Sequence, residues 1–195
     1  MLGDPLQQTS AIDMGRRESF SSVSALRSAL WKSLQDMFAY PEKSEGEIAG
    51  TIRGSVAEQY ELEQMLTVLR ISPLLTRARR AHERWVGLPF TLYYEGRLWS
   101  GTIDLAFIAD DAWSIGYVLL DPSSIDQVRV TSDASTTPLF LHAFALERLT
   151  ERLVQDVTLV DGRSGEMMPF PWGATERHSL ALELARPSTV GGAVQ

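Results

Sequence analysis

The chain has 195 residues and a formal charge of −7, from 18 basic and 25 acidic residues. This length fits one domain with one hydrophobic core, and a composition of 44% hydrophobic and 22% charged residues excludes a disordered chain or a fibre. The acidic balance gives no global attraction to nucleic acid, so any DNA contact must be local. The absence of cysteine excludes disulfides, zinc–thiolate sites and iron–sulfur clusters.

The first twenty residues lack an apolar core of signal-peptide length, and no apolar run approaches the roughly 18 residues that span a bilayer. We therefore expect a cytoplasmic protein with no membrane partner. Residues 1–20 and 186–195 are polar and interrupted by Gly and Pro, which predicts flexible ends around one domain at 21–185.

The first half of the domain has the helical period. Apolar residues spaced from Val23 to Met37 predict a helix that begins near Ser21 and ends before Pro41. The stretch 41–50 is typical of a loop, and a second helix is predicted from Ile52 to Arg70. Pro73 then interrupts the helical pattern. The basic run 76–84 predicts a short helix or the lead-in to a strand.

The second half changes period. Residues 88–121 are rich in aromatic and β-branched types, and turns at Glu95-Gly96 and Asp110-Asp111 divide them into a meander of three strands. The remaining elements predicted are a short strand at 128–131, a helix at 139–153, a strand–turn–strand unit at 154–170, and a helix or strand at 177–184. This order predicts an α+β fold, a mixed sheet with helices packed on it.

Three stretches resemble the C-terminal nuclease domain of RecB and AddA helicase–nucleases, in the PD-(D/E)XK superfamily. They are 87–107 with its Gly-x-Ile-Asp-Leu, 110–121 with its Trp followed by apolar residues and Asp, and 139–170 with its Ala-Leu-Glu-Arg-Leu-Thr. The similarity covers roughly residues 50–170. It implies a restriction-endonuclease-like fold, in which a mixed central sheet is flanked by helices.

The resemblance implies a metal centre that this chain lacks in part. Active members hold Mg²⁺ with an aspartate and a second acidic residue, and a nearby lysine assists the attacking hydroxide. Asp104 matches the aspartate, but the second acidic position falls on Tyr117 and the lysine on Leu119; a register shift of one gives Gly116 and Val118. Apolar side chains cannot ligate a hard cation.

The flanking motifs depart from the family as well. Glu58 stands where active members carry a histidine, and Pro138 and His142 replace a Gln and a Tyr. Pro138 also suggests that the third helix starts there. We therefore treat Asp104, Tyr117, Leu119, Glu58 and His142 as relic positions, with no catalytic residue assigned and no cofactor expected.

An active but divergent nuclease remains an alternative. In that case Mg²⁺ would be bound by Asp104 together with Glu83 and Asp121, although Glu83 is more simply a solvated charge and Asp104 a structural one. The three histidines, His82, His142 and His178, share no metal-ligand spacing and are interpreted as surface or boundary residues.

Two further features bear on DNA. Arg77, Arg79, Arg80 and Arg84 form the concentrated positive charge of the chain, which either contacts phosphates or is a solvated helix face. Aromatic residues could stack on single-stranded DNA but are more simply core residues. They are Trp85, Tyr93, Tyr94, Trp99, Trp113 and Trp172.

These observations favour a catalytically inactive nuclease-fold component of a helicase–nuclease DNA-repair system. Its role would be structural or DNA-guiding, with a helicase subunit or domain as partner. The alternatives are the divergent Mg²⁺-dependent exonuclease that uses Asp104, and an interaction protein that does not bind DNA.

Overall fold

The computed structural model describes residues 23–120 and 132–185, the second range with side chains from Leu139 onward. The predicted flexible ends, the strand at 128–131 and Asp121 lie outside these residues. The elements in chain order are α1 Val23–Ala39, α2 Glu45–Ala49, α3 Val56–Ile71, α4 Pro73–Arg80, β1 Glu83–Tyr94, β2 Arg97–Ala109, β3 Ala112–Leu119, α6 Ser132–Thr150, β4 Val154–Asp161, β5 Met167–Phe170 and α7 Ala174–Ala185.

The strands form one mixed sheet in the order β1-β2-β3-β4-β5, in which β3 and β4 are parallel and the other neighbours are antiparallel. The parallel pair requires a crossover, and α6 lies in that connection. This arrangement confirms the predicted mixed sheet with flanking helices.

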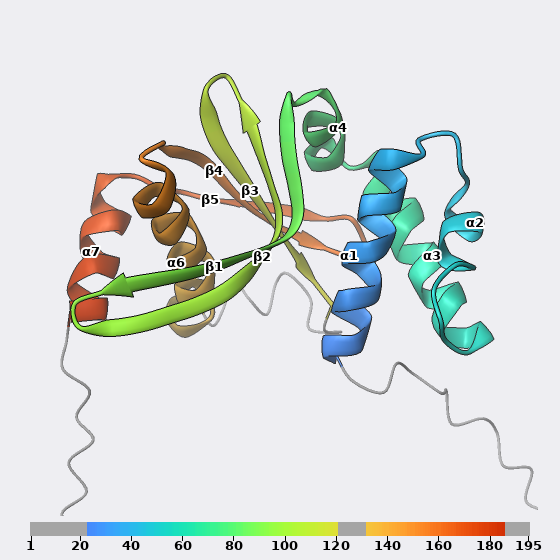
Figure 1. The fold of residues 1–195 in the computed structure, drawn as a ribbon, viewed down its shortest axis with the longest axis horizontal. Coiled ribbons are helices and arrows are strands. Elements are labelled where there is room, and N and C mark those ends of the chain that lie inside the picture. Colours follow the sequence, from blue (N-terminus) through green and yellow to red (C-terminus); the bar gives the residue numbers. More distant parts are fainter. Residues whose placement is uncertain (1–22, 121–131, 186–195) are drawn as a thin grey trace, which may run out of the picture.

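Helices cover both faces of the sheet (Figure 1). One core joins α1–α4 to Leu105, Phe107 and Val118, and a second core joins α6 and α7 to the opposite face. Among the helices that the structure describes, none has both the length and the apolar character needed to cross a bilayer.

The predicted turns of the meander are confirmed by their backbone angles. Glu95 and Gly96 have φ values of 49° and 76°, and Asp110 and Asp111 have values of 50° and 62°. Two consecutive residues with positive φ are what a tight hairpin requires, because that turn matches the twist of the strands.

Three predicted boundaries are wrong. The stretch predicted as a loop contains α2, which begins with a capping box between Ser44 and Glu47, and α3 starts at Val56 rather than Ile52 behind a second capping box from Ser55 to Glu58. Helix α6 begins at Ser132, six residues before Pro138, so that proline does not mark its start. The final element is a helix, and the basic run supplies both α4 and the first residues of β1.

Candidate functional site

Asp104 lies on β2 at a point where both neighbouring strands leave regular pairing. The β1 ladder skips from Val86 to Leu88 opposite it, and the β2–β3 ladder ends at Leu105. At the skipped position Gly87 has a φ of 64°, and a Cβ there would stand 3.1 Å from the Trp31 ring. A glycine therefore permits both the backbone conformation and the close approach of α1 to the sheet.

The Asp104 carboxylate is fully buried and accepts three hydrogen bonds. Its Oδ1 accepts from the Trp31 indole Nε1 at 2.8 Å, and its Oδ2 accepts from the Val118 backbone N–H at 2.8 Å and from the Arg27 guanidinium at 2.5 Å. On β3 this N–H lies two residues beyond Gly116, the last residue of β3 that pairs with β2. Buried charges are stable when paired and hydrogen-bonded in this way.

Arg27 comes from α1 and lies between Asp104 and Tyr117. Its guanidinium carbon is 4.7 Å from the centre of the Tyr117 ring, while its side chain is 19% exposed. The Tyr117 ring thus contacts a cation on its face, an attractive arrangement for an aromatic quadrupole. Burial raises the pKa of the Tyr117 hydroxyl, and the Asp104 charge acts in the same direction while Arg27 opposes it.

His142 lies on α6 beside the same cluster. Its ring centre is 5.9 Å from that of Tyr117 and 5.4 Å from that of Phe90, and the residue is 8% exposed. Its Nδ1 has no hydrogen-bond partner, and burial lowers its pKa to about 4. The interpretation of His142 as a surface or boundary residue is therefore wrong: it is a neutral core imidazole at physiological pH.

This set of residues does not fit a magnesium ion. Mg²⁺ takes near-octahedral oxygen ligands, but both Asp104 oxygens already accept hydrogen bonds, and an arginine cation lies where the carboxylate could receive a metal. No three His, Asp or Glu side chains in the parts of the chain that the structure describes are grouped so that they could hold a metal ion.

Two acidic residues named in the sequence analysis, Glu83 and Glu58, lie away from Asp104. Glu83 pairs opposite Ile108, four residues along the strand from Asp104, which is about 13 Å at the rise of a β-strand. Glu58 accepts the Ser55 backbone N–H in the α3 capping box, and Leu119 packs at the edge of the α6 core. Of the relic positions, the structure brings Asp104, Tyr117 and His142 together.

The four predicted DNA-binding arginines have different surroundings. Arg77 forms an ion pair with Asp156 and contacts Ser114, and Arg84 donates to the carbonyls of Ala78, Arg79 and Ala81 at the end of α4. Arg79 donates to the Arg70 carbonyl, and burial lowers its pKa. Arg80 is exposed. Among the described residues no carboxylate forms an ion pair with Arg79, Arg80 or Arg84, so this end of α4 keeps a positive surface.

Most of the aromatic residues considered for stacking are core residues. Trp113 and Trp172 are buried, and Trp85, Tyr94 and Trp99 pack against the same core. Tyr93 is the exception, with 72% of its surface exposed.

Sequence reasoning missed Arg27 and Trp31. They are 77 and 73 residues before Asp104, in a helix outside the stretch that carries the family resemblance. The sequence contained one signal for these two residues. Arg27 and Trp31 are spaced i, i+4, which places them on one face of the predicted helix.

No protein-family model and no curated protein matches the chain. Among solved structures, the chain is similar to a crystal structure from Eubacterium rectale described as a "Putative exonuclease", with a TM-score of 0.48 and 9% sequence identity. The match covers 85% of this chain and 65% of that one.

Proposed function

We propose that the chain is a nuclease-fold protein without a working metal centre, which serves as a structural or DNA-guiding component of a helicase–nuclease DNA-repair system. The observation that carries the proposal is the engagement of Asp104. Asp104, which matches the metal-binding aspartate of the family pattern, is bound by Arg27, Trp31 and the Val118 N–H, and a tyrosine takes the place of the second acid.

An arginine at this place explains how the fold can persist without a metal. A buried carboxylate needs a counter-charge, and in an active nuclease a divalent cation supplies it. Here the guanidinium of Arg27 supplies the charge internally, and the Tyr117 ring supports its other face. The sheet therefore remains stable in the absence of magnesium.

The positive end of α4 supports the DNA-guiding role. Arg79, Arg80 and Arg84 gather where α4 ends and β1 begins, with charges that no ion pair among the described residues neutralises. Phosphate contacts from such a surface would be independent of sequence and sensitive to salt.

Two measurements on the purified chain test the proposal. Linear DNA incubated with Mg²⁺ or Mn²⁺ should show no cleavage above a buffer control, whereas cleavage that disappears in Asp104→Ala would refute the loss of the metal centre. Mobility shifts at low salt should show DNA binding that weakens in Arg80→Ala, since Arg80 is exposed and forms no side-chain hydrogen bond or ion pair with the residues that the structure describes. Arg53→Ala, at another exposed arginine with no ion pair among the described residues, is the matched control. A complete absence of binding would favour an interaction protein that does not contact DNA.

A further inference from the structure

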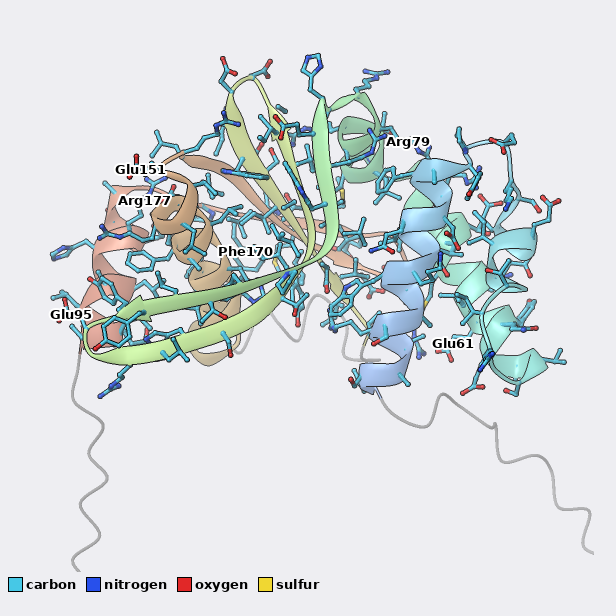
Figure 2. The ribbon with its side chains drawn as sticks, in the orientation of Figure 1. Glu61, Arg79, Glu95, Glu151, Phe170 and Arg177 are labelled. Atoms are coloured by element: carbon cyan, nitrogen blue, oxygen red, sulfur yellow. The ribbon has the colours of Figure 1, made fainter. Side chains whose placement is uncertain are left out.

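A groove of about 720 Å³ lies between α6 and α7, on the side of the sheet opposite α1–α4. Its apolar lining includes Ala174 and Ala181 from α7, and Phe144 from α6 is 4% exposed beside Arg148. Leu153, which follows α6, adds an apolar side chain to the rim and is 66% exposed. Figure 2 shows Arg177 and Glu151 close together at this end of the molecule.

Two charged residues of the lining, Glu147 and Arg177, form an ion pair with no net charge. Glu147 accepts hydrogen bonds from two nitrogens of Arg177, Nε at 2.8 Å and Nη2 at 2.7 Å. It also accepts from the Val154 backbone N–H and from the Trp172 indole. Burial favours the protonated carboxyl, but the bonds from Arg177, Val154 and Trp172 outweigh it and lower the pKa of Glu147. The charge of Arg177 is therefore neutralised within the protein by Glu147.

The rim carries the charge that remains available to a ligand. Arg148 and Arg152 are exposed and form no ion pair with any described residue, against one exposed carboxylate, Glu151. The Arg148 guanidinium lies 5.1 Å from the centre of the Phe144 ring and 5.7 Å from that of Tyr94, so its position is supported by aromatic contacts. A chain of formal charge −7 thus presents a locally positive rim around an apolar lining.

We propose that this groove binds an acidic peptide segment of a partner protein, which places an apolar side chain against Leu153 and Ala181 and pairs its carboxylates with Arg148 and Arg152. An apolar groove flanked by positive charge is complementary to an amphipathic segment with an acidic face. A nucleic-acid strand fits less well, because its phosphates gain nothing from the apolar residues of the lining. The inference is independent of the state of the Asp104 centre.

The test uses three labelled amphipathic peptides and fluorescence polarisation with the full chain. The first has glutamates on one helical face and leucines on the other; the second replaces the glutamates with lysines; the third replaces the leucines with serines. We expect binding of the first alone. Arg148→Glu and Arg152→Glu should each weaken it about tenfold or more, while Glu151→Gln should strengthen it.

Arg80→Glu is the matched control, since it makes the same charge change at an exposed site on α4. It should weaken DNA binding and leave peptide affinity unchanged, so failures of the two proposals can be told apart. Circular dichroism should show that each variant keeps its fold, and Arg152→Glu tests the charge without disturbing the ring contacts of Arg148. Equal binding of the acidic and basic peptides, no binding of either, or binding of a single-stranded oligonucleotide that both rim reversals abolish would overturn the proposal.

Discussion

Replacing Arg27 with leucine should destabilise the protein far more than an ordinary loss of a surface ion pair. Asp104 is fully buried. The change removes the one charged group that pairs with it among the described residues, and it leaves the neutral donors Trp31 and Val118. Removing one partner of a buried pair costs about 3–5 kcal/mol. The Arg27 side chain is 19% exposed, so we expect the lower end of that range, about 3 kcal/mol. Leucine keeps the helix propensity of the site.

The Arg77–Asp156 pair supplies a matched control. Its nitrogen-to-oxygen distance is 2.5 Å, the same as for Arg27–Asp104, but its side chains are 46% and 38% exposed. Water screens an exposed pair, so Arg77→Leu should lower the free energy of unfolding by less than about 1 kcal/mol. Because the two ion pairs have the same distance, the difference between their losses of unfolding free energy reports the effect of burial.

Urea unfolding followed by tryptophan fluorescence measures both variants, with linear extrapolation of the free energy to water. The double variant Arg27→Leu/Asp104→Asn completes a cycle, and its loss should be smaller than the sum of the single losses by about 2 kcal/mol, because contacting charges are coupled. The reasoning is refuted if Arg27→Leu costs no more than Arg77→Leu, or if the two single losses are additive.

Two further predictions concern buried polar groups. The folded pKa of His142 is about 4 against 6.5 in the unfolded chain, so its contribution to stability is complete above pH 6.5 and falls by about 3 kcal/mol as the pH drops to 4. His142→Leu should remove that part of the pH dependence in urea titrations between pH 4 and 7; an unchanged profile would contradict a neutral imidazole in the fold. Ser33 is fully buried on α1, and its hydroxyl has no hydrogen-bond partner among the described residues. Ser33→Ala should therefore raise the free energy of unfolding by about 1 kcal/mol. A loss of stability in Ser33→Ala would show that the hydroxyl is satisfied in solution.

The sequence predicted the sheet well because its signals are local. Each signal acts within a few residues: the aromatic and β-branched residues of the meander, the paired turn residues at 95–96 and 110–111, and the turn at Asp161. Helix α2 was missed although its signal is also local. The capping box can be recognised in the sequence as Ser44 followed three residues later by Glu47. The helix was missed because its five residues are too few to show an apolar helical period.

The site could be predicted only in part, because its contacts join distant segments. Asp104 was found through its motif, whereas its side-chain partners Arg27 and Trp31 come from a helix more than 70 residues away. The burial of His142 did have a local signal: it follows Leu139 by three residues and precedes Leu146 by four, which places it on the buried face of α6. The three histidines were compared for metal-ligand spacing, and the helical spacing of His142 was overlooked.

The basic run illustrates how one sequence feature can hold several roles. Arg84 donates to three carbonyls where α4 ends, and unpaired carbonyls at that place favour a cation. Arg77 is matched by Asp156, which lies 79 residues later. Charge spacing alone cannot separate these structural roles from phosphate contacts, because the residues that use the charges are not neighbours in sequence.

Calorimetric titration of the purified chain with Mn²⁺ tests the central claim most directly, because a working nuclease centre binds that ion through its carboxylates. The engagement of Asp104 by Arg27, Trp31 and Val118 predicts no stoichiometric binding. Stoichiometric Mn²⁺ binding that is lost in Asp104→Asn, in a variant that keeps its circular dichroism spectrum, would show that Asp104 is a metal ligand and would contradict the account.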